Sequence, residues 1–209
     1  MNLPAARFIV LDGVEGCGKS TQAELLAQAL EAQGVPVVLT YEPGGTAVGE
    51  AVRGLLLDPA YSDMHELTET FLFCAARAQH VLEVVRPALE AGKVVICDRF
   101  ASSTYVYQGY AGGVGPETVT RLNDVATGGL QPDLLIILDV DPGVGRRRKQ
   151  GDRADRIEQK SLDFHQAVRE GFLEYAARLG DRAVVLDADL DPGVLAARIL
   201  ELVWERDAG

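Results

Sequence analysis

Residues 8–21 read FIVLDGVEGCGKST, which joins a short apolar run to a glycine-rich turn and a Lys-Ser-Thr end. The apolar residues predict a buried strand, and Ala23, Leu26 and Leu30 follow at helical spacing. Between them, residues 13–20 fit the pattern G-x-x-x-x-G-K-[ST], whose glycines let the backbone turn so that its N–H groups surround a phosphate. The stretch therefore predicts a phosphate-binding loop between a strand and a helix.

The chemistry of this loop indicates ATP and Mg²⁺ as ligands. Lys19 can reach the β- and γ-phosphates, Ser20 can ligate Mg²⁺, and the positive end of the helix faces the anion. The residues expected to bind ATP are Gly13, Val14, Glu15, Gly16, Cys17, Gly18, Lys19, Ser20 and Thr21. One alternative is a glycine-rich turn with a chance Lys-Ser. A switch GTPase is disfavoured because neither Asn2 nor Asn123 stands in an Asn-Lys-x-Asp guanine reader.

Further apolar runs follow along the chain, and together with the first they lie at residues 8–11, 35–40, 93–97, 134–140 and 183–186. Their lack of polar alternation is typical of strands buried on both faces. Helical patterns separate them, including Phe164, Val168, Phe172, Tyr175 and Leu179 before the last strand. The alternation predicts an α/β fold with a five-stranded parallel sheet flanked by helices on both faces, and the length predicts a single domain over residues 1–209.

Composition excludes several classes of function. The net charge of −11 and pI of about 4.7 disfavour general affinity for nucleic acid. Residues 1–8 lack the basic flank and the uninterrupted apolar stretch of a signal peptide, and no apolar run approaches the ~18 residues that span a bilayer. We therefore expect a cytoplasmic protein without a membrane partner. Cys17, Cys74 and Cys97 are too scattered for a disulfide framework, and three histidines give no zinc spacing.

An arginine-rich segment at about residues 144–158 interrupts the apolar rhythm with Arg146, Arg147, Arg148 and Arg153. We expect a mobile lid, because a phosphoryl-transfer transition state spreads negative charge that an arriving arginine can stabilise while the lid excludes water. The alternative is a solvated run of charges.

Two residue pairs suggest a second substrate. Asp98 and Arg99 directly follow the third strand, where open α/β sheets place ligands; the carboxylate suits Mg²⁺ and the guanidinium suits a phosphate. Phe73 and Arg77 stand four apart on a predicted helix, where a ring can stack on a base and a guanidinium can reach a carbonyl oxygen. The alternatives are an ion pair that closes a loop and a core contact beside a solvated edge.

Together these residues resemble the thymidylate kinase family, in its bacterial type with the catalytic arginine in the lid. The motifs that carry the resemblance are residues 13–21, 42–46 (EPGGT), Phe73 with Arg77, 98–100 (DRF), Ser103-Thr104 with Tyr107-Gln108, and 155–158 (DRIE). The resemblance implies a P-loop kinase that phosphorylates thymidine monophosphate with Mg²⁺-ATP and feeds dTTP synthesis.

The resemblance also implies roles for individual residues. Phe73 would stack the thymine, Arg77 would read its exocyclic oxygen, and Tyr107 would disfavour a 2′-hydroxyl. The residues expected to bind the acceptor are Glu15, Glu42, Pro43, Arg53, Phe73, Arg77, Arg99, Ser103, Thr104, Tyr107 and Gln108. Those expected in catalysis are Lys19, Arg99, Arg146, Arg147, Arg148 and Arg153, with Ser20 and Asp98 as metal ligands.

One position departs from the family pattern: Tyr41 stands where similar sequences often carry arginine. The family resemblance further implies a homodimer. Two rival functions remain, which are a kinase for another nucleoside monophosphate or a deoxynucleoside, and a nucleotide switch that transfers no phosphate to a small molecule.

Overall fold

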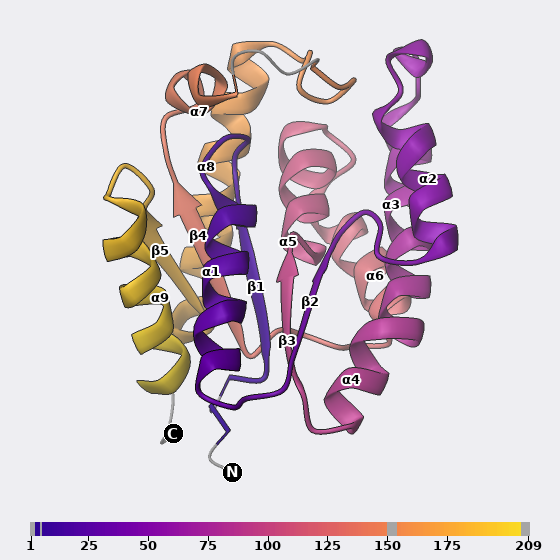
Figure 1. Ribbon diagram of the computed structural model, residues 1–209. Coiled ribbons are helices and arrows are strands. Elements are labelled where there is room, and N and C mark those ends of the chain that lie inside the picture. Colours follow the sequence, from indigo (N-terminus) through magenta and orange to yellow (C-terminus); the bar gives the residue numbers. More distant parts are fainter. Residues whose placement is uncertain (1–2, 5, 150–153, 206–209) are drawn as a thin grey trace.

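The computed structural model describes residues 3–4, 6–149 and 154–205, and its centre is a five-stranded parallel sheet (Figure 1). The strands lie in the order β2-β3-β1-β4-β5. Their bounds are Phe8–Gly13 for β1, Val37–Tyr41 for β2, Val94–Asp98 for β3, Leu134–Asp139 for β4 and Ala183–Asp187 for β5. The predicted sheet is therefore confirmed, and each strand lies within two residues of its predicted start.

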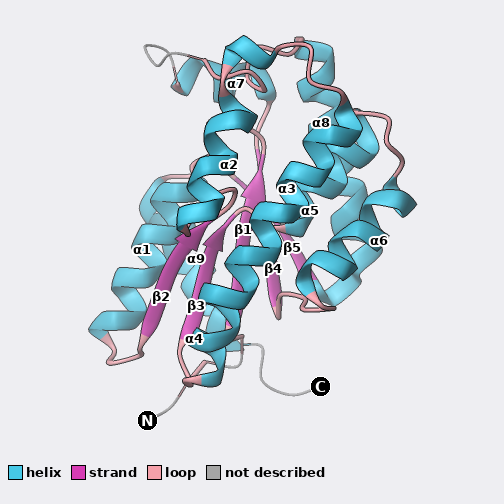
Figure 2. Ribbon diagram, turned by 90° about the vertical axis from the view of Figure 1, so that its right-hand side faces the viewer, coloured by secondary structure: helices cyan, strands magenta, loops and turns pink. Residues whose placement is uncertain are grey.

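Helices cover both faces of this sheet, as predicted (Figure 2). One face carries α1 (Lys19–Ala32) and α9 (Pro192–Glu205), which pack on each other. The other carries α4 (Arg86–Glu90), α5 (Ala101–Thr104) and α8 (Leu162–Leu179). The remaining helices are α2 (Ala47–Leu57), α3 (Glu66–His80), α6 (Pro116–Thr127) and α7 (Pro142–Arg148), with 3₁₀ turns at Pro59–Tyr61 and Gly180–Arg182.

Burial differs between the central and the edge strands. Side chains of β1, β3 and β4 are buried almost throughout, but Leu39 of β2 is 44% exposed and Val185 of β5 is 41% exposed. The expectation of burial on both faces was wrong for these two strands, because an edge strand has one neighbour and incomplete helical cover. The predicted apolar face of α1 is confirmed: Ala23, Leu26, Ala27 and Leu30 are buried.

The strand order brings two chemically rich loops together. Because β1 lies between β3 and β4, the loop that follows β1 and the loop that follows β3 leave the same edge of the sheet. The chain also contains two π-helical segments. Val81–Val85 joins α3 to α4, and Tyr105–Ala111 continues α5. The second segment carries Tyr107 and Gln108 toward the same edge, in keeping with the frequent use of π-helical turns at functional sites.

Candidate active site

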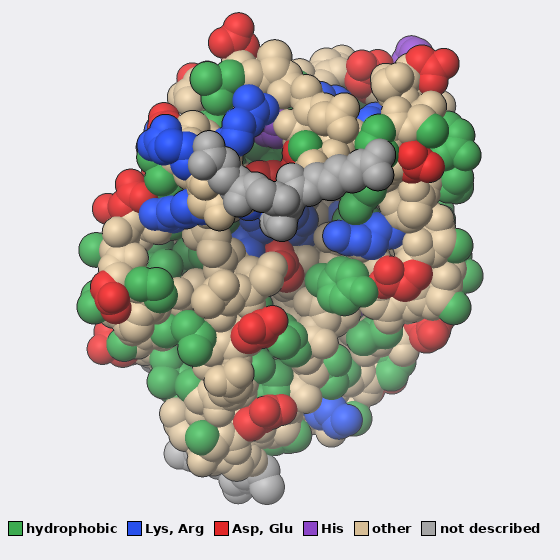
Figure 3. Space-filling view, turned by 45° about the horizontal axis from the view of Figure 1, so that its top comes forward, with side chains coloured by type: hydrophobic (Ala, Val, Ile, Leu, Met, Phe, Trp, Pro, Cys, Tyr) green, Lys and Arg blue, Asp and Glu red, His purple; other side chains and the backbone are tan. Residues whose placement is uncertain are grey.

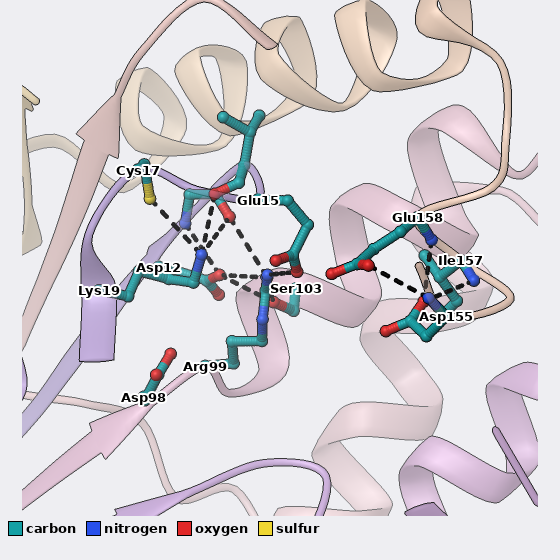
Figure 4. Close-up of polar contacts among 12 residues, drawn as sticks. Asp12, Glu15, Cys17, Lys19, Asp98, Arg99, Ser103, Asp155, Ile157 and Glu158 are labelled. Atoms are coloured by element: carbon teal, nitrogen blue, oxygen red, sulfur yellow. Dashed lines mark hydrogen bonds and ion pairs between the residues drawn. The ribbon is translucent and has the colours of Figure 1, made fainter. Parts of the chain in front are cut away.

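The phosphate loop closes around the side chain of Lys19. Its Nζ donates to the carbonyl oxygens of Val14 at 2.9 Å and Gly13 at 3.3 Å, and lies 3.5 Å from Cys17 Sγ (Figure 4). Gly18 has a φ of 96°, a left-handed conformation that glycine adopts without strain and that lets α1 begin at once with Lys19. The helix N-terminus and the lysine thus face one anion site.

Ser20 and Asp98 offer a place for Mg²⁺. Ser20 Oγ donates to Asp98 Oδ2 at 2.5 Å, which joins the start of α1 to the end of β3. The other carboxylate oxygen, Asp98 Oδ1, is buried and has no hydrogen-bond partner among the described residues. Hard oxygen donors beside a phosphate site fit Mg²⁺, which usually takes one or two carboxylates and completes its shell with substrate oxygens and water.

Arg99 is held in a left-handed backbone conformation, with a φ of 70°. Such conformations cost of order 1–3 kcal/mol and cluster at functional sites. The guanidinium pairs with Glu15, reaches Ser103 Oγ at 3.2 Å and Gly13 O at 3.3 Å, and lies 5.5 Å from the centre of the Tyr107 ring. Burial alone would raise the pKa of Glu15, but the cations Arg99, Lys19 and Lys149 outweigh it and lower that pKa.

Asp12, which the sequence analysis missed, organises this corner. It is fully buried at the end of β1 and accepts from Ser102 Oγ at 2.6 Å, Ser103 Oγ at 2.8 Å and the Gly13 N–H at 3.0 Å. Burial raises the pKa of its carboxyl, although Arg99 opposes the shift. The sequence did offer a signal for this role, because Asp12 is a carboxylate at the end of an apolar run, immediately before the phosphate loop.

A small space, here named the inner cavity, lies beneath this corner and measures about 80 Å³. Nine of the eleven expected acceptor residues line it: Glu15, Glu42, Pro43, Arg53, Phe73, Arg99, Ser103, Tyr107 and Gln108. Leu57, Asp155 and Ile157, for which no role was predicted, complete the lining. The structure thus brings together residues that are far apart in the sequence.

Arg77 and Thr104 lie behind this lining in a buried network. Arg77 donates from Nε to Glu42 at 2.8 Å, from one terminal nitrogen to Asn123 Oδ1 at 2.6 Å, and from the other to Phe100 O and Thr104 Oγ1, both at 3.0 Å. These contacts use four of the five N–H groups of a guanidinium. Arg77 therefore builds the wall of the inner cavity and has at most one N–H group left for a base.

Two further residues of this network were not predicted. His80 Nδ1 lies 2.9 Å from Glu42 Oε1, and its Nε2 lies 2.7 Å from Thr40 Oγ1. Asn123 also donates to Ala101 O at 3.0 Å, which ties α6 to α5. Glu42 is therefore fixed from two sides before any ligand arrives, and it precedes Pro43 through a cis peptide bond.

A wider space, here named the loop groove, measures about 610 Å³ and opens over the phosphate loop and β2. Gly16, Gly18, Lys19, Ser20, Thr21, Tyr41, Asp98, Arg148 and Lys149 are among its lining residues. Glu15, Glu42, Arg53, Arg99 and Asp155 line both the loop groove and the inner cavity, so the two spaces meet. Lys and Arg side chains gather around this end of the molecule (Figure 3).

Tyr41, the departure from the family pattern, contacts Arg53 across this groove. The Arg53 guanidinium lies 5.5 Å from the centre of the Tyr41 ring and donates to Pro43 O at 2.7 Å. The Tyr41 hydroxyl donates to Glu50 at 2.6 Å. An aromatic contact thus supports Arg53 at this position.

The expected lid arginines point in different directions. Arg148 lines the loop groove and donates to Ala188 O at 3.0 Å and Asp189 Oδ1 at 2.7 Å, whereas Arg146 donates to Glu158 O and Lys160 O, both at 3.2 Å. Arg147 is exposed, and Arg153 lies outside the described residues. Lys149, for which no role was predicted, pairs with Glu15 at 3.2 Å and with Glu158.

The lid helix and the phosphate loop touch backbone to backbone. A Cβ atom added at Gly16 would lie 2.1 Å from Gly145 O, and one added at Gly145 would lie 2.1 Å from Glu15 O. Gly16 also has a φ of 70°. Neither position can take a side chain while α7 stays in place, because real Cβ atoms do not approach an oxygen so closely.

A phosphate loop beside a carboxylate–hydroxyl pair, facing a second cavity at one edge of a parallel sheet, defines a P-loop phosphotransferase with an acceptor of its own. Residues 11–199 match the family model described as "Thymidylate kinase". A thymidylate kinase of Symbiobacterium thermophilum is 51% identical over 95% of this chain and 92% of the relative, and one of Maridesulfovibrio salexigens is 45% identical over 97% of each. The chain belongs to the thymidylate kinase family.

Solved structures agree with this assignment. The crystal structure of thymidylate kinase from Ehrlichia chaffeensis superposes with a TM-score of 0.77 at 33% identity, and the match covers 95% of this chain and 99% of that one. The predictions of a P-loop kinase fold and of a kinase that phosphorylates thymidine monophosphate are confirmed, and the rival functions are not favoured. Among the described residues, no helix is long and apolar enough to cross a membrane.

Proposed function

We propose that the loop groove holds ATP and the inner cavity holds thymidine monophosphate, so that the γ-phosphoryl group passes where the two spaces meet. The observation that carries this proposal is the set of shared lining residues, which includes Glu15 and Arg99. The cavity is small, and the acceptor enters it base first. Its phosphate then remains beside Arg99 and Arg53.

The reaction needs no general base, because an oxygen of the monophosphate is already ionised near neutral pH. That oxygen attacks the γ-phosphorus in line, and ADP leaves. Lys19 exchanges its contacts with the loop carbonyls for phosphate oxygens, and Arg99 orients the acceptor phosphate. Catalysis is then positioning and electrostatic stabilisation.

The ATP of this reaction carries Mg²⁺, which Ser20 and Asp98 would hold, the latter directly or through water. The ion neutralises charge on the phosphates when bound. The short Ser20–Asp98 hydrogen bond and the unpaired Asp98 Oδ1 support the assignment. These residues also hold the end of β3 against the start of α1.

Several residues of the inner cavity suit a deoxyribonucleotide. Phe73 offers a ring on which the thymine stacks, and Ser103 and Gln108 offer polar contacts. Tyr107 is buried with a hydroxyl that makes no hydrogen bond of normal geometry among the described residues. In the proposed complex Tyr107 would lie against the sugar and disfavour a 2′-hydroxyl. Glu15 would lie near the 3′-hydroxyl.

The lid, about residues 144–158, would supply the remaining positive charge from Arg146, Arg147, Arg148 or Arg153. Arg148 is favoured among the described arginines because it lines the loop groove. Lys149 joins this set, since its ammonium group already pairs with Glu15.

We also propose a cytoplasmic homodimer in which each chain acts as one domain that feeds dTTP synthesis. Leu67 and Phe71 on α3, Leu82 in the following π-helical segment and Val125 on α6 are exposed apolar side chains. Residues 67, 71 and 82 share one side of the helical run, and α3 packs on α6, so these residues suit one face that a second copy would cover. Replacing Phe71 and Leu82 by glutamate should give monomers in analytical ultracentrifugation.

ADP release tests the proposed function. The purified protein would be given Mg²⁺-ATP with thymidine monophosphate, with its ribose analogue, with each purine monophosphate and with thymidine. Thymidine monophosphate should be turned over selectively, and Tyr107→Phe should change turnover of the deoxyribonucleotide little. Equal turnover of purine monophosphates would indicate a broad kinase, and no acceptor-dependent release would indicate a switch.

A further inference from the structure

Glu69 is a buried carboxylate that lines neither the loop groove nor the inner cavity. Its side chain, on α3, is 1% exposed. Oε1 accepts from Gln108 Nε2 at 2.7 Å and lies 3.8 Å from Lys160 Nζ, while Oε2 accepts from an Arg156 terminal nitrogen. Glu69 thus joins a cavity residue to the end of the lid segment.

Arg156 is held so that it can only donate to Glu69. Its backbone N–H donates to Leu57 O at 3.1 Å and its Nε to Leu56 O at 2.9 Å, which fixes it to the end of α2. The side chain is buried, and a guanidinium carries no acceptor. The Arg156 side of Glu69 therefore requires an oxygen atom.

The carboxylate in turn fixes the amide of Gln108. A carboxylate accepts and does not donate, so Gln108 must turn its NH₂ group toward Glu69. Gln108 is buried and lines the inner cavity, and its carbonyl oxygen is the polar atom left to face that space. The Tyr105–Ala111 π-helical segment carries this residue into place.

A fixed carbonyl oxygen distinguishes pyrimidine bases by the hydrogen at N3. Thymine carries an N3–H that can donate to it, whereas cytosine presents a lone pair at N3 that repels it. We propose that Glu69 is a positioning residue that locks Gln108 as a hydrogen-bond acceptor and thereby selects bases with a hydrogen at N3. This inference rests on the proposed function, in which the inner cavity receives the base.

Glu69→Gln provides a sharp test because its effect has a direction. Arg156 still requires an oxygen, so the new amide turns its NH₂ group toward Gln108. Gln108 must then turn over and present its own NH₂ group to the cavity. We expect kcat/KM for thymidine monophosphate to fall roughly 10- to 100-fold. The value for deoxycytidine monophosphate should either rise or show a much smaller fall.

The ratio of the two kcat/KM values separates positioning from a structural role. Loss of stability alone would lower both values together and leave the ratio unchanged. Glu66→Gln is the matched control, because Glu66 lies on the same helix, three residues before Glu69, and is exposed. It should leave both values unchanged. An unchanged ratio in folded Glu69→Gln would overturn the proposal.

Gln108→Met covers the case in which Glu69→Gln does not fold, as judged by its thermal midpoint. Methionine keeps the length of the side chain but removes the amide. The ratio of kcat/KM for thymidine monophosphate to that for deoxycytidine monophosphate should therefore fall, but cytosine should not become the preferred base. A ratio equal to that of the unaltered enzyme would exclude Gln108 as the reader and overturn the proposal. Failure of the proposed function would look different, since the unaltered enzyme would then show no preference for thymidine monophosphate.

Discussion

The inner cavity and the loop groove meet at one edge of the sheet but are built differently. The wall of the cavity is a closed network in which Arg77, Glu42 and His80 are buried and hold one another. The groove is wide, and Arg148 lines it from the exposed end of α7. Under the proposed function, this difference means that acceptor selection is preformed in the fold, whereas exposed side chains complete the charge at the transferring group.

The largest expected effect is on the groove side. Lys19→Met removes the ammonium group that the loop carbonyls hold and that we expect to serve the β- and γ-phosphates. The value of kcat should fall by about 10³-fold, while KM for thymidine monophosphate changes little. Initial rates of ADP release at varied acceptor concentration measure both. A large rise in KM for the acceptor would show that the two sides are not separable.

Phe73→Ala makes the complementary change in the cavity. Base stacking on an aromatic ring is worth about 1–3 kcal/mol, so KM for thymidine monophosphate should rise about 10- to 100-fold. KM for ATP should stay the same, because Phe73 does not line the loop groove. Thr68→Ala, at an exposed position of the same helix, is the control for helix stability.

Two lid arginines, Arg147 and Arg148, allow a comparison of side chains within the loop groove and outside it. Both Arg147 and Arg148 are exposed on α7, but only Arg148 lines the groove, so Arg148→Ala should lower kcat by about tenfold and Arg147→Ala by much less. Single-turnover measurements of phosphoryl transfer would separate this effect from product release. Equal losses in the two variants would place the effective charge elsewhere in the segment.

The smallest effect concerns Glu15, which lines both spaces. Its pKa is lowered in the fold, so its ionised form stabilises the protein above the ordinary value of 4.5, and this contribution is lost as the pH falls through the folded pKa. The difference in free energy of unfolding between the unaltered protein and Glu15→Gln should shrink by about 1 kcal/mol from pH 7 to pH 3. Urea denaturation at each pH measures it. A constant difference would mean that the carboxylate gains nothing from Arg99 and Lys149.

The sequence predicted the strands and the phosphate loop because both are local signals. Continuous apolar runs identify parallel strands, and the spacing of Gly13, Gly18 and Lys19 fixes a backbone shape. Asp98 and Arg99 could be assigned to the site because they directly follow an apolar run that predicts a strand. Among the predictions about the sheet, only the exposure of the edge strands was wrong, because strand order depends on the whole chain.

The network behind the cavity could not be predicted in the same way. His80, Asn123 and Glu69 are single polar residues on helices, where periodicity assigns polar side chains to solvent. Their burial depends on how α3, α6 and the π-helical segment Tyr105–Ala111 pack together. The same packing occupies most of the Arg77 guanidinium, which the sequence analysis expected at the base.

The contact between Gly16 and Gly145 also limits which substitutions the phosphate loop can accept. The resemblance described above places the catalytic arginine in the lid, and it also implies a second type of family member with that arginine in the phosphate loop, at the position after Glu15. In this chain an arginine at position 16 would collide with the backbone at Gly145, 2.1 Å from its Cβ. A lineage that exchanged one arrangement for the other would have to shift α7 at the same time. Positions 16 and 145 should therefore change together, because a side chain at either one requires a different placement of α7.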